Sequence, residues 1–211
     1  MSTRALVWFK RDLRLHDHAP LLAAADCDQA LAVFVVEPEW LQSPEFAPRH
    51  LSYLLQCLRP LREALARRGL PLLVRSGGLP EVFEQLRRDY AFSHLFSHEE
   101  TGPGWSYARD RAVARWCRAA GVSWRQWPQG GVVRGLRRRE GWARQWQLRM
   151  DAPRLEAPQR WRGADGWRGD PVGRPRDFGV AEAAELPAAG EAAARQDLDS
   201  FLLARGRHYR R

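Results

Sequence analysis

The chain has 211 residues, of which 34 are Lys or Arg and 25 are Asp or Glu, so its formal net charge is +9. Its 45% hydrophobic residues are enough to bury a core, but no run of about eighteen apolar residues predicts a transmembrane helix, and no secretory signal pattern opens the chain. Three cysteines without CxxC spacing argue against a disulfide framework and a cysteine-based zinc site, and they suit a reducing cytoplasm. We therefore expect a cytoplasmic protein with no membrane partner, and we predict no metal site.

Short apolar runs alternate with amphipathic stretches from the start of the chain. The run RALVWF at 4–9 is bounded by polar residues and is too short for a helix, so it predicts a buried strand. The run ALAVFVV at 30–36 is continuous and rich in β-branched residues, as expected for a central parallel strand covered on both faces. Three more strands are predicted at 70–75, 93–97 and 122–127.

Helical patterns lie between the predicted strands. The longest, at 49–68, places six leucines at three- and four-residue spacing on one side. Shorter helices are predicted at 20–25, 79–88 and 106–119, the last of them ended by Gly121. The alternation predicts an α/β fold, a Rossmann-like open five-stranded parallel sheet with helices on both faces. Such a sheet binds ligands at the carboxyl ends of its strands, so we expect a site in the loops there.

The alternation stops near residue 128. Trp142, Trp146 and Met150 recur at helical spacing, but the residues from 151 to 189 show no periodicity, and a last helix is predicted at 191–204. A long structureless stretch is more typical of a connection between domains than of a compact domain. We therefore predict an α/β domain over 1–150, an irregular interdomain linker over 151–190, and a C-terminal helix within 191–211. This helix would lead to a domain outside the chain, which suggests a fragment or a part supplied elsewhere.

The positive charge is concentrated in the second part of the chain. Residues 1–120 carry 16 basic and 14 acidic side chains, whereas residues 121–211 carry 18 and 11. A basic segment beside a nearly neutral one indicates a polyanion or an acidic partner surface, with nucleic acid as the first candidate. A solvated loop with an arginine bias is an equally good interpretation.

Common catalytic and phosphate-binding motifs are missing. No GxGxxG follows the first predicted strand, and GxxxxGK[ST], HExxH and GxSxG do not occur. His16 and His18 are a weak metal pair, for which solvated or helix-capping roles are favoured. The adjacent carboxylates Glu99 and Glu100 either share a raised pKa or belong to a solvated loop. Composition and spacing alone therefore indicate an α/β domain with a basic tail and no identified ligand.

The loop after the first strand carries a more specific signal. The segment WFKRDLRLHDH at 8–18 closely resembles the opening signature of the DNA photolyase/cryptochrome family, with Lys10 where that family usually has arginine. Further resemblances follow in the expected order: VVEP at 35–38, PR at 48–49 and ARDRAV at 108–113. The resemblance covers about residues 4–150.

The resemblance implies the light-harvesting N-terminal domain of a deoxyribodipyrimidine photolyase, an enzyme that repairs ultraviolet pyrimidine photoproducts by FAD-dependent, light-driven electron transfer. Such a domain can hold methenyltetrahydrofolate, a deazaflavin or a flavin as antenna chromophore, and an empty pocket is a serious alternative. A helical FAD-binding domain of the same full-length protein is the implied partner. DNA would bind through that full-length protein, a monomer. No catalytic residue is expected in the present chain.

The resemblance also points to residues around the antenna site. Glu37 ends the second strand, and Arg49 and His50 begin the long helix. Glu99 or Glu100 would accept hydrogen bonds from ring N–H groups, and Trp105 would fill the cavity or stack on a chromophore. Arg11 would face the antenna cleft or the second domain.

Four charged residues in the family signatures are expected to be structural: Asp12, Arg14, Arg109 and Asp110. Asp12 can pair with Arg11 or Arg14 and so shape the loop after the first strand. Arg109 and Asp110 are expected to open a helix. The helix dipole would stabilise the carboxylate of Asp110 at this N-terminus, and Arg109 could reach across a domain interface.

Two other classes of function remain open. The chain could belong to a cryptochrome-like blue-light photoreceptor, or it could be a non-catalytic binding module. A free nucleotide-binding α/β domain of the electron-transfer-flavoprotein or stress-protein type is a third hypothesis. The missing glycine-rich loop and the intact signature at 8–18 disfavour it.

Overall fold

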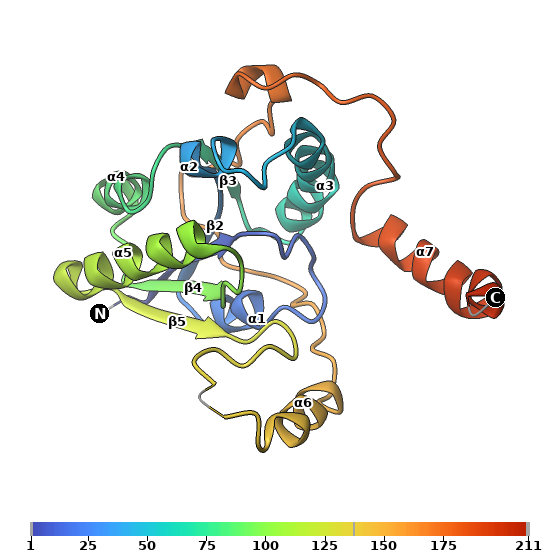
Figure 1. The fold of residues 1–211 in the computed structure, drawn as a ribbon. Helices are drawn as coiled ribbons and strands as arrows, with labels where there is room; N and C mark the ends of the chain where they lie inside the picture. The colour runs from blue at the N-terminus through green and yellow to red at the C-terminus, as the bar shows by residue number, and fades with distance from the viewer. Residues whose placement is uncertain (1, 137, 210–211) are drawn as a thin grey trace.

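A five-stranded, all-parallel sheet forms the centre of the computed structural model, which describes residues 2–136 and 138–209 (Figure 1). Met1, Arg137, Arg210 and Arg211 belong to predicted segments but lie outside the described residues. The strand order is β3-β2-β1-β4-β5, which confirms the predicted sheet. Every strand begins and ends within two residues of its predicted bounds: β1 (Arg4–Phe9), β2 (Gln29–Val36), β3 (Leu72–Ser76), β4 (His94–His98) and β5 (Ser123–Trp127).

Each face of the sheet has its own hydrophobic core. Successive residues of a strand point to opposite faces, so Val7 and Phe9 of β1 enter one core and Leu6 and Trp8 enter the other. The first core includes buried residues of α1 (Ala19–Ala25) and α3 (Pro48–Arg67), and the second those of α4 (Glu81–Tyr90) and α5 (Gly104–Ala120). Burial on both faces explains why the central strands are uninterrupted apolar runs.

The helix α5 ends as predicted but begins earlier. Gly121 follows it with a φ of +67°, a left-handed conformation that glycine adopts without strain. At the other end α5 begins at Gly104, directly after Pro103, whose carbonyl accepts hydrogen bonds from Ser106 and Tyr107. The expectation that Arg109 and Asp110 open this helix is therefore wrong, because both lie in its second turn.

The segment from 151 to 190 contains no α-helix, only a 3₁₀ turn at Pro175–Phe178, but it packs tightly against the sheet. The backbone of Ala30 in β2 accepts a hydrogen bond from Ala164 and donates one to Arg162, and Asp170 bonds to Leu72 of β3. Four residues of the segment are buried in the two cores: Ala157, Trp161, Ala164 and Val172. A segment without periodicity therefore covers the outer edge of the sheet. Its buried residues follow neither helical nor strand spacing, so the sequence pattern did not identify them.

Two further helices lie away from the sheet. The helix α6 (Trp142–Met150) follows β5, and α7 (Glu191–Leu203) projects from the rest of the molecule (Figure 1). None of the residues of α7 is buried. The carboxylate of Glu191 anchors its first turn by accepting backbone hydrogen bonds from Leu15 and His16.

The chain also forms a short helix, α2 (Pro38–Leu41), and a 3₁₀ turn at Arg205–His208, neither of which the sequence pattern predicts. Among the described residues, no helix has the length and apolar character needed to cross a lipid bilayer.

Replacing Trp161 tests whether the irregular segment belongs to the folded unit. Its ring is 2% exposed and its Nε1–H donates to the Leu21 carbonyl over 2.9 Å. We expect Trp161→Ala to lower the free energy of unfolding by about 3–5 kcal/mol, as for other buried aromatic residues. Leu148→Ala, at an exposed position of α6, should change it by no more than about 0.5 kcal/mol. Equal effects in urea unfolding would contradict this role.

Candidate functional site

The candidate site lies where the direction of the sheet reverses. The chain passes from β1 to β2 and β3 on one side of β1, and then returns to place β4 on its other side. Loops at the carboxyl ends of parallel strands diverge at such a point and leave a crevice. Residues that follow β1, β2 and β4 meet here, and α3 and α5 form the walls.

The crevice has an outer and an inner part. The outer cavity measures about 370 Å³ and is mostly apolar, and a recess of about 30 Å³ continues it toward the sheet. Arg11, Trp40, Leu54 and Trp105 line both parts. The outer cavity is completed by Ser43, Glu45, His50, Tyr53 and Pro103, and the recess by Trp8, Phe9, Lys10, Phe34, Val35, Glu37, Glu100 and Arg109.

A buried network of charges lines the recess. The guanidinium of Arg109, whose side chain is 8% exposed, lies 2.7 Å from Glu37, 3.1 Å from Glu100 and 2.9 Å from Asp110. The ammonium of Lys10 lies 3.1 Å from the other oxygen of Asp110. Burial would lower the pKa of Arg109, but the carboxylates of Glu37 and Asp110 raise it, so this cation keeps its charge. Three loops and α5 are thereby held together by opposite charges.

Glu37 is the unusual member of this network. Burial raises its pKa to about 7, although Arg109 and Lys10 favour the ionised form and Glu39 opposes it. Near neutral pH this carboxyl therefore exists in both protonation states. It can accept a hydrogen bond when ionised and donate one when protonated, as suits a group that faces a polar ligand.

Aromatic rings and cations alternate along the wall of the recess. The Lys10 ammonium lies 4.2 Å, and the Arg109 guanidinium 4.8 Å, from the ring centre of Trp8. Arg109 also lies 5.4 Å from the Trp105 ring. The Nε1–H of Trp105 is buried and has no hydrogen-bond partner among the described residues, which leaves one donor beside the cavity. An unpaired buried donor is costly, so it favours a ligand that offers an acceptor.

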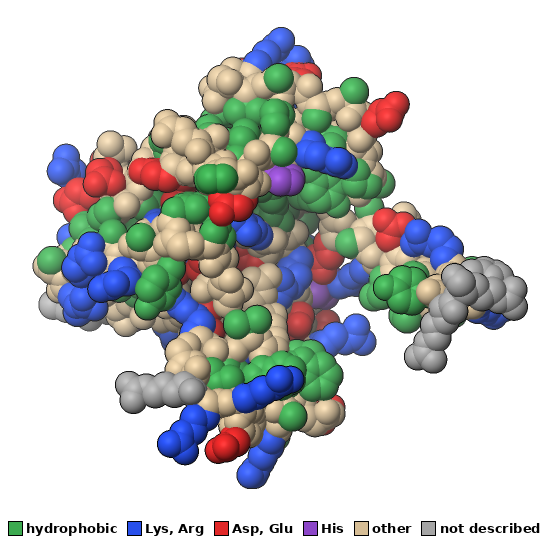
Figure 2. All heavy atoms as spheres, in the orientation of Figure 1, with side chains coloured by type: hydrophobic (Ala, Val, Ile, Leu, Met, Phe, Trp, Pro, Cys, Tyr) green, Lys and Arg blue, Asp and Glu red, His purple; other side chains and the backbone are tan. Residues whose placement is uncertain are grey.

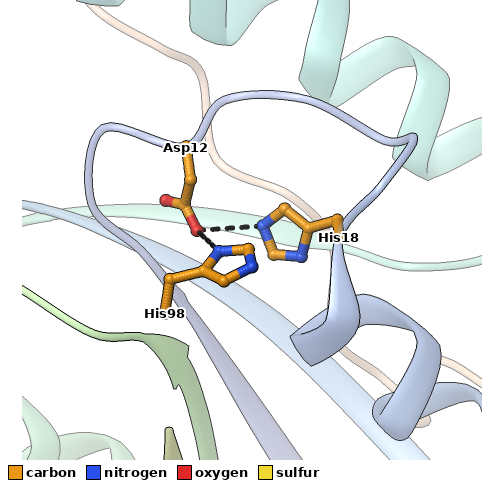
Figure 3. A group of neighbouring side chains, drawn as sticks. All are labelled: Asp12, His18 and His98. Carbon is orange, nitrogen blue, oxygen red and sulfur yellow. Dashed lines mark hydrogen bonds and ion pairs between the residues drawn. The ribbon is translucent and has the colours of Figure 1, made fainter. Parts of the chain in front are cut away.

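A second buried cluster lies behind the crevice, where Asp12, His18 and His98 meet (Figure 3). One oxygen of Asp12 lies 3.0 Å from Nε2 of His18 and 2.5 Å from Nδ1 of His98, while the other accepts the backbone N–H of Lys10 over 2.8 Å. Burial alone would raise the pKa of Asp12, but the two adjacent imidazoles of His18 and His98 hold it well below its usual range. The carboxylate thus joins the loop after β1 to the end of β4.

The predicted pairing of Asp12 with Arg11 or Arg14 is therefore wrong. Arg14 instead donates to the carbonyls of His16 and Asp17. His18 does have a capping role, because its Nδ1 accepts the backbone N–H of Leu21 at the start of α1. The loop turns so tightly that Asp12 faces inward, whereas the neighbouring arginines stay nearer the surface.

The structure brings five of the seven predicted site residues to the crevice. Arg11 and Trp105 line both parts, Glu37 and Glu100 line the recess, and His50 lines the outer cavity. Arg49 is exposed and Glu99 lies outside the lining. Lys10, Trp40 and Arg109 are among the lining residues that the sequence pattern did not identify. Both Lys10 and Arg109 lie within the family signatures, but the sequence indicated a structural role for Arg109 and no particular role for Lys10.

Comparison with known proteins places these observations in context. A family model described as DNA photolyase matches residues 5–134. A deoxyribodipyrimidine photo-lyase of Synechococcus sp. is 33% identical over 125 residues, which cover 58% of this chain and 25% of that protein. A chloroplastic/mitochondrial cryptochrome DASH of Arabidopsis thaliana is 33% identical over 103 residues, covering 46% of this chain and 18% of that protein.

A solved structure extends the likeness to nearly the whole chain. The crystal structure of an archaeal photolyase from Sulfolobus tokodaii is described as holding two FAD molecules and implying a novel light-harvesting cofactor. It superimposes with a TM-score of 0.71 at 20% identity, covering 96% of this chain and 46% of that one. At this identity the likeness shows the fold alone. The chain spans less than half the length of these proteins.

The raised pKa of Glu37 has a measurable effect on stability. As the pH rises from about 4.5 to about 7, the unfolded chain loses this proton while the folded protein keeps it, so the free energy of unfolding falls. Glu37→Gln cannot titrate. The wild type minus variant difference in unfolding free energy should therefore decrease by up to roughly 3 kcal/mol across this window.

Urea unfolding at a series of pH values measures this difference. Glu63→Gln, which removes an exposed carboxyl from α3, is the matched control. A difference that is constant or rises with pH would show that Glu37 is simply the ionised partner of Arg109.

Proposed function

The chain belongs to the DNA photolyase family, and we propose that it is the antenna and support domain of a light-driven, FAD-dependent deoxyribodipyrimidine photolyase. The observation that carries the antenna role is the two-part cavity at the carboxyl edge of the sheet. Its outer volume of about 370 Å³ lies in the range of cavities that bind cofactor-sized ligands. Its apolar walls and convergent polar groups fit a planar ring system with a polar edge.

The residues that line the cavity fit such a chromophore in three ways. Trp105 and Trp40 offer flat surfaces for stacking, and the Nε1–H of Trp105, which no described residue accepts, offers a hydrogen bond. Glu37 and Glu100 offer carboxylate oxygens for ring N–H groups. Arg11 is exposed at the mouth, where its charge suits a carboxylate or phosphate tail.

When bound, methenyltetrahydrofolate, a deazaflavin or a flavin would supply light absorption and pass the excitation energy on. The protein contributes rigid placement and exclusion of water. The ion pairs of Arg109 fix the polar floor of the recess, and the packed leucines of α3 fix one wall. Nothing in this role requires a catalytic side chain from the present chain.

We propose that the catalytic FAD and the damaged DNA are held by a helical domain of the same full-length protein. The exposed apolar side chains of α7, Leu198, Phe201, Leu202 and Leu203, support this partner, since such a row is costly to leave in water. The greater length of the relatives also supports it. Basic side chains surround α6 in Figure 2, which agrees with a polyanion nearby.

A cryptochrome-like photoreceptor is the second candidate function. The likeness to cryptochrome DASH favours it as directly as the likeness to photolyase favours repair. Both candidates would use the same antenna cavity. They differ in whether the absorbed light energy drives DNA repair or a light signal. Light-dependent repair of a thymine-dimer oligonucleotide by the full-length protein distinguishes them.

Chromophore binding is the direct test of the antenna role. Wild-type protein should bind methenyltetrahydrofolate or FMN, with an absorption band at longer wavelength than that of the aromatic residues. Trp105→Ala should weaken binding by about tenfold or more, the usual cost of losing an aromatic stacking partner. Tyr107→Ala, an exposed position of the same helix, should bind like wild type. Failure of every offered chromophore to bind would contradict the proposal.

The 211-residue chain by itself should show no photorepair under any illumination, because the proposed FAD site lies in the other domain. Repair is measured by high-performance chromatography of an oligonucleotide that contains a single pyrimidine dimer. A full-length photolyase provides the positive control. Light-dependent repair by this chain would require a catalytic centre within it and would overturn the division of labour proposed here.

A further inference from the structure

The cluster of Asp12, His18 and His98 is unlike the other charged groups of the protein. Its members come from the loop after β1, the residue before α1 and the end of β4, so they are far apart in sequence. Their side chains are 1%, 0% and 3% exposed, and one donor atom from each lies within 4.8 Å of the others. Figure 3 shows both imidazole rings directed at the same carboxylate oxygen.

The charge of this cluster is not balanced by a basic side chain. Among the described residues, no Lys or Arg side chain forms an ion pair with Asp12. Lys10, although it lies two residues away, directs its ammonium to Asp110 instead. A buried carboxylate without a full positive charge beside it is expensive, so a cation at this position would stabilise the fold.

We propose that Asp12, His18 and His98 form a binding site for one first-row divalent transition-metal ion, with Zn²⁺ as the representative. Two imidazole nitrogens and one carboxylate oxygen are the donors that such ions prefer, whereas Mg²⁺ and Ca²⁺ prefer oxygen alone. The ion would supply the positive charge that the carboxylate lacks.

The two rings must move to bind one ion. Bonds of about 2.0–2.1 Å place the ligand atoms of one ion roughly 3 Å apart, so the three ligand atoms, which lie within 4.8 Å of one another, must draw together. Nε2 of His18 already lies 3.0 Å from the Asp12 oxygen, in a direction that leaves it without a well-formed hydrogen bond. Nδ1 of His98, at 2.5 Å, must retreat by about 0.5 Å, which a small rotation of the ring provides.

Metal binding also changes the tautomer of both histidines, because the ring proton of each moves from the nitrogen that binds the ion to the other ring nitrogen. Each neutral imidazole binds the ion through one nitrogen and carries its proton on the other. In His18 the proton moves to Nδ1, which gives up the capping hydrogen bond from Leu21. The N–H of Leu21 keeps the carbonyl of His18 as acceptor, at 3.0 Å. In His98 the proton moves to Nε2.

Another cavity reaches the cluster at His98. It measures about 260 Å³, and His98 lines it together with Arg14, Asp17 and Gln129. Three protein ligands leave at least one coordination position for water, which this cavity can supply. The ion would hold the loop after β1 against the end of β4. This site is separate from the crevice, so the inference does not depend on the antenna role.

Zinc binding to the intact chain tests the proposal. After treatment with EDTA and desalting, calorimetric titration with ZnCl₂ should give one site per chain and a higher unfolding temperature. His18→Asn keeps a helix-capping side chain but removes a ligand, and His98→Gln removes another. Each should weaken binding by at least about 10- to 100-fold, the effect of losing even a supporting partner of a metal site. His94→Gln, at the start of the same strand, should bind like wild type.

A measurement on the wild type keeps the test decisive if a variant fails to fold. Co²⁺ added in place of Zn²⁺ should give the intense visible spectrum of a four- or five-coordinate site. In a separate experiment, binding of Zn²⁺ should shift the side-chain ¹⁵N resonances of two histidines. Absence of binding, binding equal in all three variants, or the pale spectrum of hydrated Co²⁺ would overturn the proposal. The cluster would then be a carboxylate that is hydrogen-bonded to two imidazoles only.

Discussion

The burial of one carboxylate, that of Asp12, organises the carboxyl edge of the sheet. A charge removed from water must find partners, and here it finds three: the backbone of Lys10 and the rings of His18 and His98. These contacts turn the loop after β1 back over the sheet, set the first turn of α1 and fasten the loop to β4. The polar groups of Asp12 and His18 are thereby directed into the protein. Arg11 is consequently presented at the mouth of the crevice rather than paired inside it.

A second set of buried charges continues this arrangement on the other side of β1. Arg109 joins carboxylates from the loops after β2 and β4, and Lys10 joins Asp110 while covering the ring of Trp8. Removing any one partner would leave the others buried without compensation, so the network holds the floor of the cavity in one geometry. The apolar walls above this floor come from α2, α3 and α5. The result is a cavity with a charged base and aromatic walls, which suits the chromophore role proposed above.

The irregular segment after α6 contributes to the fold despite having no repeating structure. It places Trp161 in one core and pairs with β2 and β3 at the edge that would otherwise be open. The chain then leaves the sheet and ends in α7, whose apolar side chains contact little of the present structure. One edge of the sheet is thus covered by the chain itself, and α7 carries the exposed apolar side chains that support the partner domain proposed above.

The sequence by itself determined the sheet, the long helices that cover it and the resemblance to the family. Uninterrupted apolar runs occur only where both faces are covered, and leucines at helical spacing occur only where one face is covered. It also indicated where the crevice lies, because residues that follow strands in a parallel sheet meet at one edge. It did not determine which charges pair. Asp12 has arginines beside it in sequence, yet it bonds to His98, which is 86 residues away. Only the tertiary structure decided this, and likewise that Trp161 is buried and that Arg109 faces inward. Pairing depends on which groups are buried together, and burial is a property of the packed molecule that local pattern does not contain.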